Sequence, residues 1–182
     1  EVMRAAVDAG AAMINDVRAL QVPGALQAAA STRAAVCLMH MLGEPQSMQQ
    51  QPRYDDVVTQ VRSFLEQRLH TCMNNGIDTE RLCLDPGFGF GKTMAHNLTL
   101  LRELRQLAQM QRPLLVGLSR KSMLQQLTGH GPEHRMAGSI ALATLAVSRG
   151  ARIVRAHDVS ATVDAVAVAW AAGAQGSQGE AK

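Results

Sequence analysis

The chain has 182 residues and a formal net charge of +3, and 47% of its residues are hydrophobic. This length and composition fit one globular domain and exclude a chain that is mainly disordered. No apolar run reaches the roughly 18–20 residues of a membrane-spanning helix, and the charge is too low for a nucleic-acid-binding face. Three widely spaced cysteines without a CxxC pair fit a reducing compartment. We therefore expect a cytoplasmic protein without membrane or nucleic-acid partners.

Short apolar segments alternate with longer helical patterns along the whole chain. The first pattern has apolar residues at helical spacing from Val2 to Ala9 and stops at Gly10, which predicts a helix at the start of the sequence. Strands of a parallel sheet with both faces covered are short, mostly apolar and bounded by glycine, proline or polar turns. The segments with these properties are residues 11–16, 35–40, 82–85, 114–119 and 152–157.

The segments between these strands predict helices. Residues 54–75 carry an apolar stripe with a 3.6-residue period, and Asn97 is the predicted N-cap of the next helix. Pro132 fits the first turn of a helix that stops at Gly150. A last helix is predicted over residues 160–172, with Ser160 as its N-cap.

Five strands with interleaved helices permit two α/β architectures. An open doubly wound sheet would be complete at this length, whereas a (β/α)8 barrel needs about 250 residues. Length alone therefore favours the open sheet. We expect one domain over residues 1–172, with an aperiodic loop at residues 41–53 and a flexible tail at residues 173–182.

Polar residues collect where the five predicted strands end, and α/β proteins bind their ligands at that edge of the sheet. Side chains two residues apart share a face of a strand, so Arg155 and His157 form a donor pair suited to phosphate oxygens. A histidine in this position also commonly makes a structural hydrogen bond. The residues at the strand ends are Asn15, Asp16, Met39, His40, Asp85, Ser119, Arg120, Lys121, Arg155, His157 and Asp158.

The segment DPGFGFGKT at residues 85–93 is the most unusual in the chain. Its alternating glycines allow the backbone to approach a ligand closely, and Phe88 and Phe90 favour a wall against a flat ring. An ordinary loop with two hydrophobic plugs is the alternative. The segment ends like a P-loop, but that motif needs glycine where Pro86 stands, so we do not predict a nucleoside triphosphate site.

Residues 113–122 predict a strand, a turn and the start of a helix. Ser119 is the predicted cap of that helix, whose free N–H groups attract an anion together with Arg120 and Lys121. A capped helix with two solvated basic residues is the alternative. The sequence contains no cluster with zinc-ligand spacing and no visible nucleophile–base pair.

Five motifs occur in the order and spacing of the dihydropteroate synthases: INDVR (14–18), CLMHM (37–41), LDPGFGFGK (84–92), GLSRKS (117–122) and RAHDV (155–159). The chain resembles this family, in particular its bacterial chromosomal type, over essentially all its residues. The resemblance implies a (β/α)8 TIM barrel and overrides the preference for an open sheet. This chain would supply roughly the fourth to eighth βα units of a partial pterin-binding barrel.

The resemblance also implies an activity. Dihydropteroate synthases condense p-aminobenzoate with 7,8-dihydropterin pyrophosphate and release pyrophosphate in folate synthesis, with Mg²⁺. In this sequence Asn15 and Asp85 would bind the pterin edge, and Arg155 and His157 the pyrophosphate. Lys121 would contact the pterin carbonyl or a ring nitrogen. The remaining implied contacts are Met39, Phe90 and Gly117 along the pocket, and Ser119, Phe90, Arg120 and Lys121 near p-aminobenzoate, the position that sulfonamides mimic.

The catalytic residues implied in this way are Lys121, Arg155 and His157, and no metal ligand is expected within this chain. The main Mg²⁺ ligand is expected in the first three units, which the sequence lacks. A homodimer is expected for the full-length protein, and this chain alone is expected to be inactive. Two other functions stay open: a pterin-binding domain of the methyltransferase type, and a non-catalytic five-stranded binding module.

Overall fold

A computed structural model describes residues 1–43, 48 and 52–173. Within these residues the strands form one parallel sheet in the order β1-β2-β3-β4-β5. An open doubly wound sheet reverses its strand order at a switch point, whereas a barrel adds each strand beside the last. The preference for an open sheet that rested on length is therefore wrong. The strands are β1 (Met13–Asp16), β2 (Ala35–Met39), β3 (Leu82–Asp85), β4 (Leu114–Val116) and β5 (Ala151–Val154).

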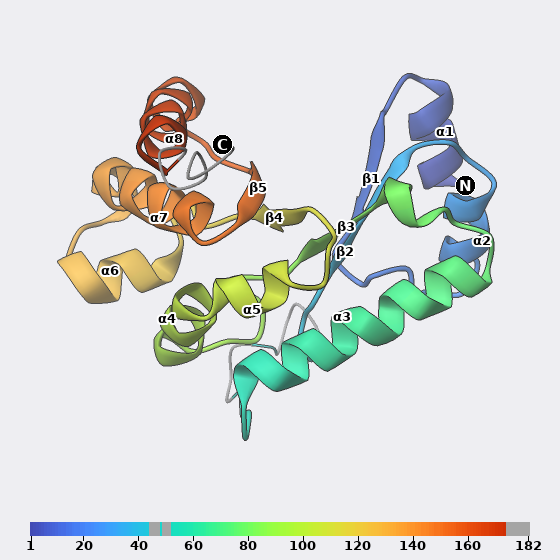
Figure 1. The fold of residues 1–182 in the computed structure, drawn as a ribbon, viewed down its shortest axis with the longest axis horizontal. Helices are drawn as coiled ribbons and strands as arrows, with labels where there is room; N and C mark the ends of the chain where they lie inside the picture. Colours follow the sequence, from blue (N-terminus) through green and yellow to red (C-terminus); the bar gives the residue numbers. More distant parts are fainter. Residues whose placement is uncertain (44–47, 49–51, 174–182) are drawn as a thin grey trace, which may run out of the picture.

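The helices lie around the outside of these strands, with α1 and β1 at one end of the arrangement and α8 and β5 at the other (Figure 1). None of the helices in the described ranges combines the length and apolar character that a bilayer crossing requires. The helices are α1 (Val2–Asp8), α2 (Ala25–Ala30), α3 (Val57–Asn74), α4 (Met94–Arg102), α5 (Leu104–Ala108), α6 (Ser122–Thr128), α7 (Met136–Ser148) and α8 (Val159–Gly173), with 3-10 turns at Thr79–Arg81 and Pro132–His134.

The long helix α3 confirms the periodicity of residues 54–75. The Asp56 carboxylate accepts hydrogen bonds from the backbone N–H groups of Val58 and Thr59 and so caps the first turn. The predicted stripe faces the sheet, because all its members but the half-buried Phe64 are buried: Val57, Val58, Val61, Leu65, Leu69 and Cys72. The helix thereby covers the outer face of the strands with apolar surface.

The two faces of the sheet have different cores. The outer face packs against the helices in a large hydrophobic cluster, whereas the inner face carries a small one of Cys37, Cys83 and Leu115, with Met13 and Ile153 against it. Side chains two residues farther along a strand share its face. The inner face therefore continues at the carboxyl edge with Asn15, Met39, Asp85, Gly117 and Arg155.

The predicted cap at Asn97 is wrong. Thr93 caps α4, since its hydroxyl accepts from the His96 N–H while the His96 side chain accepts from the Thr93 N–H. Asn97 lies in the first turn and is buried, with its side-chain oxygen 2.8 Å from the Gly89 nitrogen. A tertiary contact has therefore replaced the expected local one.

Several observed helix boundaries differ from the predicted ones. Pro132 belongs to a separate 3-10 turn, and α7 begins only at Met136. Helix α8 begins at Val159 and ends at Gly173, so Ser160 is not its cap and Gly173 is not part of a tail. Residues 174–182 and most of the predicted loop at 41–53 lie outside the described residues.

Gly87 carries a testable packing constraint, because its φ is +69° and a Cβ there would collide with the His40 carbonyl oxygen. We expect Gly87→Ala to lose more unfolding free energy than the roughly 1–2 kcal/mol that a left-handed backbone costs an alanine. Gly76→Ala is the matched control, since Gly76 has φ +81° and no neighbouring heavy atom within 4 Å of a Cβ. Urea unfolding measures both variants, and equal losses would contradict the packing argument.

Candidate functional site at the carboxyl ends of the strands

The centre of the site is the carboxylate of Asp85, the last residue of β3, which is only 1% exposed. Its Oδ1 accepts a 2.7 Å hydrogen bond from the Gly87 N–H. Its Oδ2 has no hydrogen-bond partner among the described residues and lies 3.6 Å from Arg155 Nη2. Burial raises the pKa of Asp85, opposed by the Gly87 N–H and the nearby cations Arg155, Lys92 and Lys121. A buried acceptor without a donor is a site for a ligand N–H group.

Lys121 and Phe90 form one side of the site. The Lys121 ammonium lies 4.4 Å from the centre of the half-buried Phe90 ring, a cation–π contact. Burial and the neighbouring Arg155 lower the pKa of Lys121, whereas Asp85 raises it. A Cβ at Gly89 would lie 3.1 Å from Lys121 Cδ, so glycine at this position makes room for the lysine side chain.

Arg155 and His157 line a small cavity of about 140 Å³ that Lys121 also borders, together with Gly117, Ser119 and Ala156. A Cβ at Gly117 would lie 2.7 Å from Arg155 Nη2, so the missing side chain leaves space for the guanidinium. His157 Nδ1 lies 2.9 Å from Ser119 Oγ, and its backbone N–H also donates to that oxygen. The predicted helix cap at Ser119 is therefore wrong: its hydroxyl orients His157, and α6 has no side-chain cap.

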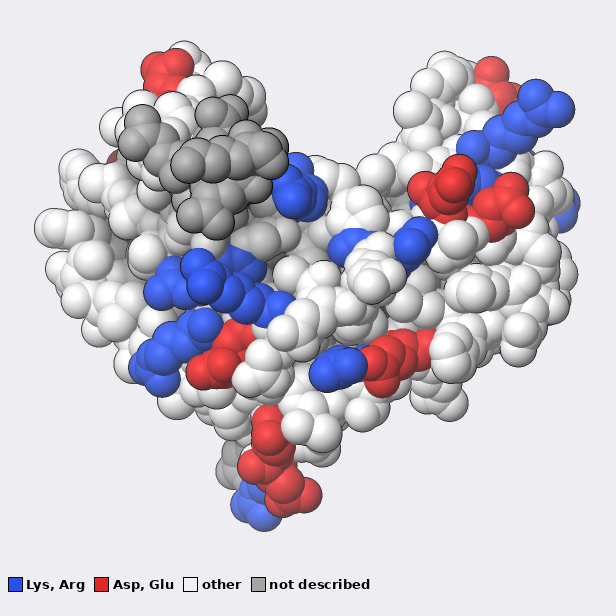
Figure 2. Space-filling view, viewed as in Figure 1, with Lys and Arg blue, Asp and Glu red and all other residues white. Residues whose placement is uncertain are grey.

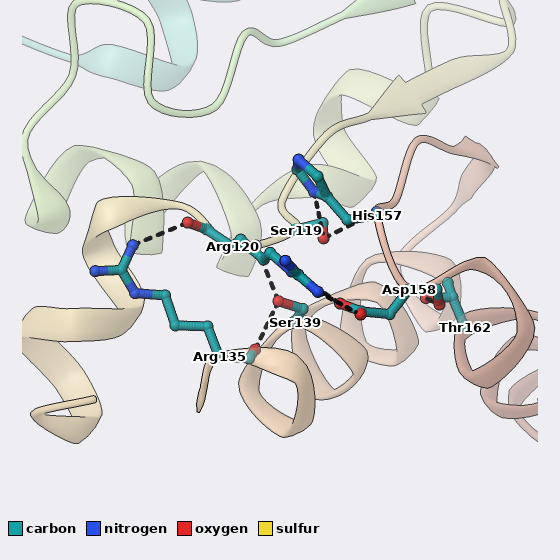
Figure 3. Close-up of polar contacts among 7 residues, drawn as sticks. All are labelled: Ser119, Arg120, Arg135, Ser139, His157, Asp158 and Thr162. Carbon is teal, nitrogen blue, oxygen red and sulfur yellow. Dashed lines mark hydrogen bonds and ion pairs between the residues drawn. The ribbon is translucent and has the colours of Figure 1, made fainter. Parts of the chain in front are cut away.

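The Arg120 side chain points toward Asp158, whereas Ser119 and His157 lie against each other (Figure 3). Its guanidinium forms a two-point ion pair with Asp158, with Nη2–Oδ1 and Nε–Oδ2 distances of 2.6 and 3.2 Å. Its backbone has φ +55°, and its N–H donates to Ser139 while its carbonyl accepts from Arg135. Arg120 does not line the cavity of Arg155 and His157. Its interactions instead tie the loop before α6 to α7 and α8.

Asn15 and Met39 occupy neighbouring strands of the same edge. Asn15 is exposed and pairs in register with Cys37, on the inner face. Met39 is fully buried and pairs in register with Asp85, and it also lines a cavity of about 410 Å³ that reaches Phe64 on α3. The structure thus brings Asp85, Lys121, Arg155 and His157 together, with Asn15 and Met39 on the adjoining strands.

Sequence reasoning missed Lys92, which is 3% exposed and belongs to the glycine-rich segment. Its ammonium lies within 3.1 Å of His40 Nδ1 and the carbonyl oxygens of Gly87 and Phe90. Burial lowers the pKa of Lys92 to about 7, and burial with the nearby ammonium lowers the pKa of His40 to about 3. The available signal was a lysine directly after a glycine-rich run. Sequence reasoning considered this lysine only as part of a P-loop motif, which the segment does not match.

The described residues hold no group of three or more histidine, cysteine or acidic side chains placed to bind a metal ion. Figure 2 shows acidic side chains interspersed with basic ones over one face of the molecule.

A family model described as "Pterin binding enzyme" matches residues 1–157. The chain belongs to this family. It is 50% identical over 168 residues to dihydropteroate synthase from Escherichia coli K12, covering 92% of this chain and 60% of that protein. It is 47% identical over 171 residues to the Haemophilus influenzae enzyme. The chain thus spans about 60% of the length of these curated relatives.

Solved structures of family members agree with the fold. A Yersinia pestis dihydropteroate synthase in complex with a sulfonamide drug has a TM-score of 0.94 and 48% identity, covering 96% of this chain and 64% of that one. A Xanthomonas albilineans dihydropteroate synthase in complex with 7,8-dihydropteroate has a TM-score of 0.88 and 52% identity, covering 95% and 65%. The chain is therefore part of a (β/α)8 barrel, which confirms the expected fold class.

The contact between Arg155 and Asp85 predicts a measurable electrostatic coupling. We expect Arg155→Met to raise the pKa of Asp85, because the substitution removes a positive charge 3.6 Å from its Oδ2. A pH titration of the Asp85 carboxyl carbon by NMR measures the change. Arg152→Met is the control, since Arg152 lies on β5, just before Arg155, but packs over the Trp170 ring. An unchanged pKa in Arg155→Met would show that the two groups do not interact.

Proposed function

We propose that the whole protein is a dihydropteroate synthase, which condenses p-aminobenzoate with 7,8-dihydropterin pyrophosphate and releases pyrophosphate in folate synthesis. The observation that carries this proposal is the buried Asp85 carboxylate, whose Oδ2 lacks a hydrogen bond among the described residues, beside Lys121 and Arg155. Related proteins support it, since one solved Xanthomonas albilineans enzyme holds 7,8-dihydropteroate and another holds 4-aminobenzoic acid.

The pterin end of the site follows from Asp85. A 2-aminopyrimidinone presents two adjacent N–H donors, which match the two oxygens of a carboxylate. Asn15 extends the same inner face toward the amide edge of the ring, with Met39 and Gly117 along the pocket. Lys121 would donate to the pterin carbonyl or a ring nitrogen. Phe90, which already contacts Lys121, offers a flat wall for a ring, with Ser119 near p-aminobenzoate.

The pyrophosphate end follows from Arg155 and His157. The p-aminobenzoate nitrogen attacks the pterin methylene carbon, the carbon–oxygen bond breaks, and pyrophosphate leaves with the bonding electrons. The new ammonium group then loses its proton to solvent. Because negative charge develops on the leaving group, a guanidinium and an imidazole in place beforehand stabilise the transition state without a nucleophilic side chain.

Our proposal for the whole protein includes Mg²⁺, a homodimer and a cytoplasmic location. The donor set of the described residues does not fit a magnesium site by itself, so the main ligand would come from outside this chain, and no step above depends on the ion. Exposed apolar side chains on α8, such as Val163, Val168 and Trp170, offer a face for protein contacts. Three buried, unpaired cysteines fit a reducing compartment.

Loss of the Asp85 charge should remove pterin binding. Asp85→Asn is expected to weaken pterin affinity by about 1.5–3 kcal/mol for each hydrogen bond to the carboxylate. Because burial raises the pKa of Asp85 above the usual 3.8, wild-type affinity should also fall in mild acid as the carboxylate protonates. Isothermal titration with a pterin across pH measures both effects. Asp164→Asn, on the exposed side of α8, should bind normally; equal affinity in Asp85→Asn would contradict the proposal.

Loss of the Arg155 charge should impair turnover and product binding. In the whole protein, Arg155→Met is expected to lower kcat/KM, because it removes charge stabilisation of the leaving group. The corresponding increase in activation free energy is about 2–4 kcal/mol. Pyrophosphate should also inhibit this variant less strongly. A synthase assay with added pyrophosphate measures both, and Arg152→Met, on β5 just before Arg155, serves as the control. A wild-type protein without synthase activity would reject the proposed function.

A further inference from the structure

Lys92 is a buried cation that the reaction described above leaves without a role. It is 3% exposed and lies just before Thr93, the cap of α4. Its ammonium faces three acceptors: His40 Nδ1 at 2.9 Å, the Gly87 carbonyl at 3.0 Å and the Phe90 carbonyl at 3.1 Å. Taking an ammonium out of water is costly unless hydrogen bonds replace its hydration, so this geometry is a specific arrangement rather than incidental packing.

The three acceptors define the form of the lysine that fits. An ammonium group has three N–H donors and no acceptor, whereas a neutral amine has only two donors and a lone pair. His40 is 5% exposed, and its low pKa keeps the imidazole neutral; the tautomer protonated at Nε2 offers Nδ1 as an acceptor. The charged form of Lys92 therefore supplies one N–H donor to each of these three acceptors, with the His40 carbonyl oxygen farther away at 3.5 Å.

The residues that Lys92 holds belong to the segment that forms the site. Gly87 donates to Asp85 Oδ1, and Phe90 carries the cation–π contact with Lys121. Other contacts fix the same segment from outside: the Tyr54 hydroxyl donates to the Gly91 carbonyl, and Asn97 accepts from the Gly89 N–H. The Phe90 N–H also donates to the Gly87 carbonyl within the segment, and Lys92 adds contacts that tie both carbonyls to the His40 side chain at the end of β2.

We propose that Lys92 is a positioning residue of the synthase reaction: its ammonium clamps the Gly87 and Phe90 carbonyls to His40 and so holds Asp85 and Phe90 in their binding positions. The inference rests on the proposed function for what binds there. The clamp itself rests only on the contacts of Lys92.

The charge of Lys92 has a second effect at Asp85. The positive charge favours the ionised carboxylate and so lowers the pKa that burial raises. The titratable groups that face Lys92 are Asp85 on β3, His40 after β2, Lys121 before α6 and His96 on α4. Because Asp85 must be ionised to accept pterin N–H groups, Lys92 extends pterin binding to lower pH.

The test compares Lys92→Met with Thr93→Ala in the whole protein. Methionine keeps a long apolar stem but removes all three N–H donors and the charge. We expect Lys92→Met to raise the KM for p-aminobenzoate at least tenfold. We also expect it to raise the pH below which pterin affinity falls, called the acidic limb of pterin binding, by roughly one unit. Thr93→Ala removes the cap of the adjoining helix and destabilises the same region, yet it should change neither quantity.

Hydrogen exchange at the Phe90 amide supplies a readout that does not depend on activity. Lys92→Met should speed this exchange, whereas Thr93→Ala should not. If KM, the acidic limb and the exchange rate all stay at wild-type values in Lys92→Met, the inference is wrong. If the wild type lacks synthase activity, the proposed function fails, and the exchange measurement still decides the clamp.

A second variant covers the case in which Lys92→Met does not fold. His40→Leu removes the Nδ1 acceptor, supplies no other side-chain acceptor and leaves the lysine in place. It should raise the KM for p-aminobenzoate without moving the acidic limb of pterin binding. An unchanged KM together with unchanged exchange at Phe90 in this variant would overturn the clamp.

Discussion

The burial of the Asp85 carboxylate is the constraint on which the rest of the site depends. A charge taken out of water destabilises the fold unless hydrogen bonds and opposite charges compensate it. Here one oxygen receives the Gly87 N–H, and three cations, Lys92, Lys121 and Arg155, stand nearby. The other oxygen lacks a hydrogen bond among the described residues. The site is thus built around a buried acceptor for which the described residues supply no donor.

Glycines make this arrangement possible because they let backbone and cations approach one another. A side chain at Gly87 would strike the His40 carbonyl, one at Gly89 would crowd Lys121, and one at Gly117 would crowd the Arg155 guanidinium. The glycine-rich segment is therefore not a flexible connection. It is held at both its carbonyls and its N–H groups, and the space beside Gly89 is filled by the Lys121 side chain.

Local patterns in the sequence predicted the strands, the stripe of α3 and the edge at which polar residues meet, since these depend on spacing along the chain. They did not predict the architecture, because an open sheet and part of a barrel share the same local patterns and differ only in strand order. The caps assigned to Asn97 and Ser119 failed for a related reason: both side chains found tertiary partners, Gly89 and His157. The burial of Lys92 likewise depends on His40, 52 residues earlier.

The position of Arg155 explains how one cation can serve both ends of the site. Its Nη2 lies 3.6 Å from Asp85 Oδ2, too far for a hydrogen bond, and its side chain is 44% exposed. The guanidinium therefore contributes charge to Asp85 without spending its N–H donors there. Those donors face the cavity that His157 lines, where Ser119 fixes the imidazole. A ligand N–H group at Asp85 and an anion beside Arg155 would thus engage different groups of the same site.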